Sequence, residues 1–456
     1  MLVEEVPATP AGPIPTGTAR GTGRVEVLVL DAELRQALVA ARSLGRLGLR
    51  VGLVKGGNAD PGRLSAPSRY SRWAAWCQDT AADFGEDPDA YGEEVLALAA
   101  ANPGCVVLPC SDGSLGTLRP LRRRLAAHAR VAMAAEAALD TAVDKLRTLQ
   151  LAAELSIPVP ASIPVRADDE IAAALGGARY PVVVKPMASW VREPAGERLL
   201  ASEATCAAEA DAGIRALLER GIPAIVQPWL SGRRESVTVF RVGGVTVAAV
   251  SMAAARTTPV LGGASVVRET IPLDPTLRAH TEALLAAAGL DGYASVEFRR
   301  DAAGVARVME INPRLEGSVE VPLRAGVDFP QLLWRWATGR PVERVAGYRT
   351  GVRMRWLTGD VRWLAENLRA PDRPDALPAV AAVRTFVGSF AGRQAYDFLD
   401  WQDPRPLVAE VGRVLAKHVA TRRAAPGTAP VPGTAAPGRP PTRPAARTVL
   451  PRPVTP

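Results

Sequence analysis

The chain has 456 residues, of which 48% are hydrophobic, so it is long enough for about three domains with sizeable buried cores. Its formal net charge is +8, but residues 421–456 contain six arginines and no acidic residue, which leaves +2 for residues 1–420. This balance does not support a basic body that binds nucleic acid. No apolar run reaches the roughly 18 residues that a membrane-spanning helix needs.

Both ends of the chain are predicted to be disordered. Residues 1–23 and 421–456 are rich in Pro, Ala, Gly and Thr and cannot bury enough apolar surface to fold. The basic C-terminal tail could contact an acidic partner, or it could have no partner at all. The first ten residues lack the apolar core of a secretory signal, so we expect a soluble, cytoplasmic protein without a membrane partner.

Residues 24–137 alternate between apolar runs and helical patterns. Val25–Leu30 and Cys105–Pro109 are predicted strands, and Arg35–Leu47 is a predicted helix. This alternation is typical of the α/β class, in which helices flank a parallel sheet. The first strand is followed by Asp31 and not by a glycine-rich turn, which argues against a dinucleotide site.

Lysine is rare, and its positions in residues 138–340 are therefore informative. Of 55 lysine and arginine residues, only four are lysine. Lys145 opens the predicted helix Asp144–Leu155, and Lys185 lies at the end of the apolar run Tyr180–Pro186, a predicted buried strand. A compact ammonium suits phosphate as a point charge, whereas a lone surface lysine would simply be solvated.

A hairpin is predicted further along the chain. The runs Ala294–Arg300 and Val305–Ile311 are predicted strands, and the residues between them suit a type I turn. Counting back from the turn pairs Glu297 with Val308. Glu297 would then lie diagonal to Glu310 on the same face.

Three oxygen donors are therefore expected on one face of this hairpin. Asn312 shares the face of Glu310 because side chains two apart on a strand point the same way. Two carboxylates and a carboxamide are hard ligands, so Glu297, Glu310 and Asn312 could hold one or two Mg²⁺ beside a triphosphate. Arg314 follows and offers a planar fork for an oxyanion.

A second candidate segment surrounds the pair Gly262-Gly263. Arg256 precedes the pair, and Ser265 and Arg268 follow it. Two glycines let the backbone approach a ligand closely, which predicts a loop on the substrate side with Arg256 and Arg268 as candidate catalytic residues. The alternative is an ordinary flexible turn.

In order and spacing, these motifs resemble the ATP-grasp superfamily. The matching frame consists of Asp144-Lys145, Val182–Pro186, Ile225–Glu235, Glu297 and Glu310–Arg314. Within the superfamily, the sequence is most similar to the carboxylate–amine ligase branch, the group that includes peptidoglycan D-aspartate ligase and relatives resembling carbamoyl-phosphate synthetase. The resemblance covers about residues 25–405.

The resemblance implies an α/β fold that is α+β in its catalytic part. A Rossmann-like domain at residues 24–137 would precede the ATP-grasp domain at 138–340. A small C-terminal cap would follow at 341–420.

The resemblance also implies a role for each motif residue. Lys145 and Lys185 would contact the phosphates of ATP, and Glu235 the ribose hydroxyls. Arg314 would stabilise charge on the transferred phosphoryl group. Two Mg²⁺ ions, which Mn²⁺ can replace, would be held by Glu297, Glu310 and Asn312. The adenine would be bound by the hinge residues Gln227, Pro228, Trp229 and Leu230.

The implied activity is an ATP- and Mg²⁺-dependent ligase. It would join a small-molecule carboxylate, such as an amino acid or peptide, to an amine through an acyl phosphate, with release of ADP and phosphate. Two alternatives stay open: an enzyme that uses bicarbonate, such as biotin carboxylase or carbamoyl-phosphate synthetase, and a protein that binds ATP without turnover.

The substrate pair and the oligomeric state, a homodimer included, are not specified by the sequence. Candidates for recognition of the acceptor are Ser68–Arg72, Ser111–Ser114, Glu316 and Glu320. Each of these could equally have a structural role.

Overall fold

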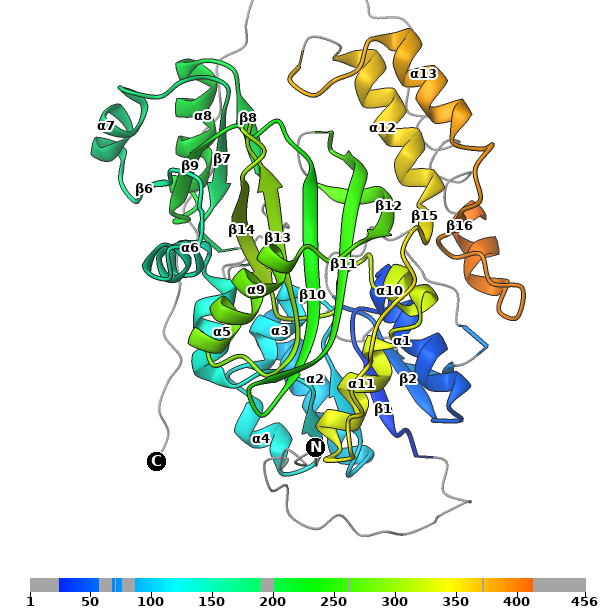
Figure 1. Ribbon diagram of the computed structural model, residues 1–456. Helices are drawn as coiled ribbons and strands as arrows, with labels where there is room; N and C mark the ends of the chain where they lie inside the picture. The colour runs from blue at the N-terminus through cyan, green and yellow to red at the C-terminus, as the bar shows by residue number, and fades with distance from the viewer. Residues whose placement is uncertain are drawn as a thin grey trace, which may run out of the picture. The chain divides into compact units, whose positions relative to one another are not determined.

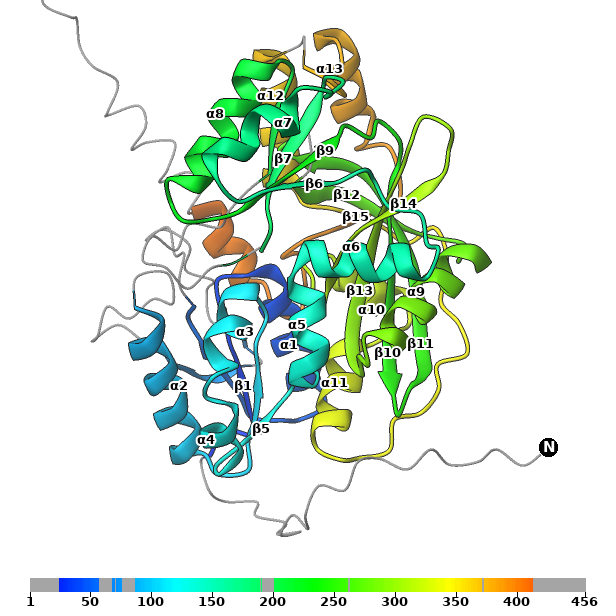
Figure 2. The same ribbon diagram turned by 90° about the vertical axis from the view of Figure 1, so that its left-hand side faces the viewer.

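The computed structural model describes residues 24–56, 68–69, 71–75, 87–188, 190, 201–260, 263–370 and 373–412. These residues belong to one compact unit, Met1–Val414. The tails that the sequence predicts to be disordered, residues 1–23 and 421–456, lie outside them. Figures 1 and 2 show three sheets in this unit, and the predicted mixture of parallel and antiparallel sheets with helices is confirmed.

The first section is a parallel five-stranded sheet in the order β3-β2-β1-β4-β5. Its central strand β1 pairs in parallel with β2 and β4. Val27–Val29 are fully buried, as expected for a strand covered on both faces. The elements are β1 (Val27–Val29), α1 (Arg35–Arg46), β2 (Val51–Val54), β3 (Ser71–Ala75), α2 (Pro88–Ala101), β4 (Val106–Leu108), α3 (Asp112–Leu118), α4 (Arg122–Ala126) and β5 (Arg130–Val131).

Two helices, α5 (Glu136–Val143) and α6 (Lys145–Glu154), connect this section to a small antiparallel sheet in the order β6-β9-β7-β8. Helix α8 packs its buried Ala210 and Ile214 against this sheet, so the small sheet has a core of its own. The elements are β6 (Ile163–Val165), the short 3₁₀ helix Asp168–Glu170, α7 (Ile171–Leu175), β7 (Val182–Pro186), β8 (Ser202–Ala204), α8 (Ala207–Leu218) and β9 (Ala224–Pro228).

The third sheet has seven strands in the order β14-β13-β10-β11-β12-β15-β16. Its buried residues join those of the first section in two continuous cores, so these two sheets support each other. The elements are β10 (Arg234–Val242), β11 (Val245–Thr258), β12 (Ala264–Ile271), α9 (Pro275–Ala287), β13 (Gly292–Arg300), β14 (Ala306–Asn312), α10 (Glu320–Ala325), α11 (Phe329–Ala337), β15 (Arg353–Arg355) and β16 (Ala395–Tyr396).

The cap consists of α12 (Leu357–Arg369) and α13 (Ala379–Gly388), which Figure 1 shows beside β12 and β15. Buried charges hold it there. Asp360 is fully buried, and its Oδ2 accepts hydrogen bonds from Arg355 at 2.6 Å and from Arg256 at 2.7 Å. Among the described helices, none combines the length and the apolarity needed to span a bilayer.

Residues 395–403, which we term the C-terminal strap, run from the cap back to α1. Three aspartates of the strap pair with three arginines of that helix: Asp397 with Arg35, Asp400 with Arg46 and Asp403 with Arg42. Asp403 and Arg42 are almost completely buried and lie 3.0 Å apart. Charge-assisted hydrogen bonds thus attach the end of the described chain to its beginning.

Candidate functional site

Glu297 and Glu310 lie directly opposite each other on β13 and β14. The predicted pairing of Glu297 with Val308 is wrong by two positions along β14. The turn accounts for one position, since Arg300 pairs with Ala306, and a register shift between Glu297 and Phe298 accounts for the other. A β-bulge inserts one extra residue into one strand and re-aims the side chains beyond it. The bulge therefore brings the two carboxylates closer together than the predicted diagonal.

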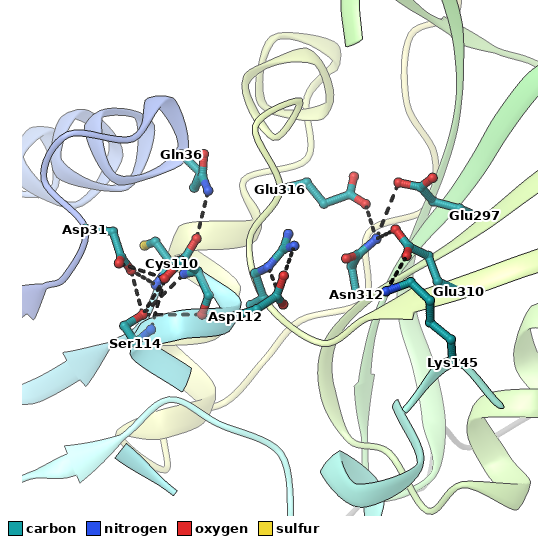
Figure 3. A network of polar contacts seen from close by, with 12 residues as sticks. Asp31, Gln36, Cys110, Asp112, Ser114, Lys145, Glu297, Glu310, Asn312 and Glu316 are labelled. Carbon is teal, nitrogen blue, oxygen red and sulfur yellow. Dashed lines mark hydrogen bonds and ion pairs between the residues drawn. The ribbon is translucent and has the colours of Figure 1, made fainter. Parts of the chain in front are cut away.

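The side chain of Asn312 contacts both carboxylates. Its Nδ2 lies 3.4 Å from Glu297 Oε1 and 3.3 Å from Glu310 Oε1, and it also donates to Glu316 at 3.3 Å (Figure 3). Burial and the nearby charge of Glu297 raise the pKa of Glu316 to about 7. This acidic cluster lies at the end of β14, where the strand leaves the sheet.

Both predicted lysines approach this cluster from the other side. The first turn of α6 is joined to the end of β7, since Lys145 N donates to Met187 O at 3.1 Å. Lys145 Nζ lies 3.7 Å from Glu310 Oε2. Burial lowers the pKa of Lys185 to about 8, while the charge of Glu310 opposes this shift.

The charge of Glu310 is stabilised by these cations. Burial disfavours its ionised form, but Lys145, Lys185 and Arg234 outweigh burial and lower its pKa. Arg234, which the sequence analysis missed, donates to both oxygens of Glu297 at 2.9 and 2.7 Å. In the sequence, Arg234 is marked only by its position directly before Glu235. The structure places both residues on β10, which pairs with β13.

Arg314 points to the first section of the fold. Its Nε and Nη2 donate to Asp112 Oδ1 and Oδ2 at 3.0 and 2.8 Å, which is the bidentate geometry expected for a guanidinium and a carboxylate. Asp112 begins α3. Burial disfavours the charge of Arg314, but Asp112 outweighs burial and raises its pKa.

The segment Ser111–Ser114 has a structural role in this part of the site. Ser111 caps α3, and Asp31 at the end of β1 accepts hydrogen bonds from Ser111 Oγ at 2.7 Å and from Ser114 Oγ at 2.6 Å (Figure 3). Cys110 N also donates to Asp31 at 2.8 Å. This network fixes the loop that carries Asp112, and with it the position of Arg314.

Two adjoining cavities meet at the acidic cluster. The first, of about 480 Å³, is lined by Glu297, Arg314, Glu235 and Arg268, and the second, of about 550 Å³, by Lys145. Four residues line both cavities: Asp112, Trp190, Glu310 and Asn312. These volumes are typical of small-molecule sites.

The predicted hinge begins with the last two residues of β9 and lines neither cavity. Gln227 pairs with Val183 in the sheet, and its Nε2 donates to Ser162 Oγ at 2.8 Å. Pro228 pairs with Val182 at the end of the same ladder. The last two hinge residues are Trp229, whose ring lies 4.2 Å from the Arg299 guanidinium, and the buried Leu230.

Glu235 lies in the wall of the first cavity, and its Oε1 and Oε2 accept hydrogen bonds from Arg300 at 3.3 and 2.9 Å. A ribose would therefore have to share this carboxylate with Arg300. In the loop after Lys185, residues 189 and 191–200 lie outside the described residues, and Trp190 covers Gly116 of α3.

The two arginines predicted for the substrate-side loop lie in different parts of the structure. Arg268 lines the first cavity. Arg256 lines neither cavity and donates to Asp360, to Thr385 O at 3.2 Å and to Ser389 Oγ at 3.0 Å. Gly262 lies outside the described residues, and a Cβ on Gly263 would meet Thr258 O at 2.3 Å, so this glycine serves a tight turn.

Three of the candidate acceptor residues make structural contacts. Ser68 Oγ and Arg69 N donate to Asp403 of the C-terminal strap at 2.5 and 2.8 Å. Glu320 accepts from Arg324 at 2.6 Å within α10. Glu316 lies in the wall of the first cavity, as do Ser111, Asp112 and Gly113 of the candidate segment Ser111–Ser114.

The donor set fits a hard divalent cation. Glu297 and Glu310 offer carboxylate oxygens, and the amide of Asn312 contacts both, so its oxygen can join them if the amide is turned over. Within the described residues, no group of three or more His, Cys, Asp or Glu side chains is placed to hold a metal, so the set depends on Asn312.

A family model described as "ATP-grasp in the biosynthetic pathway with Ter operon" matches residues 222–360. No curated protein matches the chain in sequence. A similar solved structure is the biotin carboxylase domain dimer of Hydrogenobacter thermophilus 2-oxoglutarate carboxylase with MgADP and bicarbonate, at 14% identity over 73% of this chain and 74% of that chain, with a TM-score of 0.55. N5-carboxyaminoimidazole synthetase from Staphylococcus aureus is 15% identical over 72% of this chain and 81% of its own, with a TM-score of 0.52. L-amino acid ligase from Bacillus licheniformis is 16% identical over 73% of this chain and 79% of its own, with a TM-score of 0.51. At these identities the likeness shows the fold.

Proposed function

We propose that the chain is an ATP-grasp enzyme, an ADP-forming ligase that uses ATP and Mg²⁺ to join a small-molecule carboxylate to an amine. The family model over residues 222–360 and the shared fold support this proposal. The observation that carries this proposal is the meeting of Lys145, Glu310 and Asn312 with Arg314 where the two cavities adjoin. Cations for phosphate and oxygen donors for a metal are thus present at one place.

We assign the phosphates of ATP to the second cavity, which Lys145 lines. Lys185 lines neither cavity, but its charge interacts with Glu310 and Lys145. Glu297, Glu310 and Asn312 would hold Mg²⁺, which neutralises phosphate charge and aligns the γ-phosphate when it is bound. Arg314 is held by Asp112 near the junction of the cavities, where charge develops during phosphoryl transfer. The adenine and ribose roles of Gln227–Leu230 and Glu235 stay part of the proposal.

The reaction requires no covalent nucleophile from the protein. A substrate carboxylate oxygen attacks the γ-phosphorus, ADP leaves, and an acyl phosphate forms. An amine then attacks the carbonyl carbon, and phosphate leaves with the electron pair of the broken C–O bond. The protein contributes position and charge, from residues that are fixed before the substrate binds.

Bicarbonate as the carboxylate substrate is the second candidate. It is suggested by the biotin carboxylase domain of similar fold, which was solved with bicarbonate. The identity of 14% shows a shared fold, so it gives bicarbonate no priority over an organic acid.

The test is analysis of the nucleotide products after incubation with Mg·ATP and pools of amino acids and small carboxylates. We expect ADP and phosphate to appear only when a carboxylate and an amine are both present. Release of AMP would refute the acyl-phosphate route. ADP release with bicarbonate alone would establish the second candidate, and binding of ATP without any turnover would refute both.

A further inference from the structure

The first cavity ends at a pair of arginines that share one aspartate. Arg268 Nη2 donates to Asp397 Oδ1 at 2.6 Å, and Arg35 Nη1 contacts Asp397 Oδ2. Arg35 comes from α1, Arg268 from β12 and Asp397 from the C-terminal strap, so three distant segments build this pair. Both arginines line the cavity.

Asp397 pairs only part of the Arg268 guanidinium. Arg268 is only 2% exposed, and its Nε and Nη1 make no hydrogen bond with any described residue. Its remaining bond is a long one, 3.4 Å to Gly317 O. A buried cation with unpaired N–H groups is costly unless a ligand supplies the missing acceptors.

Two acidic side chains, Glu33 and Glu410, also line this cavity. Glu33 accepts from Gly56 N at 3.0 Å, and Glu410 accepts from Thr358 Oγ1 at 2.9 Å. Burial and the neighbouring Asp31 raise the pKa of Glu33 to about 7, so at neutral pH it carries only part of a negative charge.

The loop after β14 leaves room for the Arg35 side chain. Gly317 has no side chain, and a Cβ there would lie 3.0 Å from Arg35 Nη2. The other face of the site is aromatic: the Arg35 guanidinium lies 4.3 Å from the centre of the Trp356 ring, and Phe398 also lines the cavity. Stacking and the salt bridge hold the guanidinium in place before a ligand arrives.

We propose that Arg35 and Arg268 form a subsite for a second acidic group of the substrate, a carboxylate remote from the one that is phosphorylated. This inference rests on the proposed ligase function, in which the reacting carboxylate lies near Arg314. The substrate class is then a dicarboxylate or an acidic amino acid, bound along the cavity between Arg314 and the shared Asp397. A neutral analogue would leave the N–H groups of Arg268 unpaired.

The test is calorimetric binding of a fixed panel to the full chain in the presence of Mg·ADP, which prevents turnover. The panel is succinate, glutarate and L-glutamate, each compared with its amide partner succinamate, glutaramate or L-glutamine. We expect at least one diacid to bind about tenfold or more tightly than its amide partner. The variants Arg35→Gln and Arg268→Gln should each remove this preference.

Arg241→Gln is the matched control, because Arg241 is also buried but lines neither cavity. It should keep the preference for diacids. Since Arg268 is buried, its variant is first compared with the wild type by thermal unfolding. The Arg35 side chain is 15% exposed and therefore less buried than Arg268, so Arg35→Gln stays informative if Arg268→Gln fails to fold.

The inference falls if no diacid binds more tightly than its amide partner, or if the Arg35→Gln variant keeps the preference. These results are separate from the ligase test. ADP release with neutral substrates that is unchanged in both variants would leave the proposed function standing without the subsite. Diacid binding that depends on both arginines but supports no ADP release would leave the subsite standing without the ligase.

Discussion

The binding of nucleotide should depend on the protonation of Lys185. Burial lowers the pKa of this ammonium from 10.5 to about 8, with further lowering by Lys145 and Arg299. Phosphate favours the charged form, so a nucleotide that contacts Lys185 must bind to the protonated protein. This contribution is complete well below pH 8 and is lost as the pH rises through 8.

The size of the effect follows from the pKa of about 8. The charged fraction falls from about 0.9 at pH 7 to about 0.1 at pH 9, so the apparent affinity should fall about tenfold over this range. At pH 8, where half of the lysine is neutral, binding should take up about half a proton for each nucleotide bound.

Calorimetry with Mg·ADP, whose phosphates stay ionised across this range, measures both quantities. Titrations at pH 7, 8 and 9 give the affinity, and a pair of buffers with different ionisation enthalpies gives the proton uptake. Lys185→Arg is the control, since a guanidinium stays charged and should bind with little dependence on pH. The reasoning is refuted if the wild type shows no change in affinity, or if the arginine variant shows the same decrease.

Three further predictions concern the metal site, the phosphoryl site and the cap. Glu310→Gln should lower ADP release at least about a hundredfold through loss of a metal ligand, with a thermal midpoint close to wild type; a normal rate would contradict the assignment. Arg314→Lys should lower the rate about tenfold or more, because an ammonium cannot make the forked contact; unchanged kinetics would place the role elsewhere. Asp360→Asn should destabilise the protein by about 3–5 kcal/mol in urea unfolding, because two buried arginines lose their counter-ion. The partly exposed pair of Asp301 and Arg307 gives the comparison, since Asp301→Asn should destabilise the protein much less than Asp360→Asn.

Local patterns predicted the parts of the site that depend on a single element. Lys145 was expected at the start of a helix, and α6 begins there because Asp144 accepts hydrogen bonds from Leu146 N and Arg147 N. The strand that carries Lys185 was recognised from its apolar run, and β7 confirms it. Such features depend on the nearest neighbours in the sequence, so they can be read from it.

The hairpin register could not be predicted in the same way. A bulge adds one residue to one strand, and the alternation of apolar and polar side chains in the sequence changes too little to show where it lies. Packing of Val308 and Ile311 into the core decides the register on each side of the bulge. The sequence therefore identified Glu297 and Glu310 but set their strands two residues out of register, one residue at the turn and one at the bulge.

The roles of Arg256 and Arg268 were equally hidden. Both are arginines that flank one glycine pair, yet one is bound by Asp360 of the cap and the other by Asp397 of the strap. Each partner lies more than a hundred residues away along the chain, since the separations are 104 and 129 positions. No local pattern connects residues that meet only through the tertiary fold.

The C-terminal strap has a consequence for synthesis on the ribosome. Arg35 and Asp397 are 362 positions apart, and Arg42 and Asp403 are 361. At a typical elongation rate, about 20 to 70 s separate the emergence of α1 from that of its acidic partners. During this interval the first section has its strands but not its counter-charges, so a nascent chain halted before the strap would expose uncompensated arginines where chaperones and anionic surfaces can reach them.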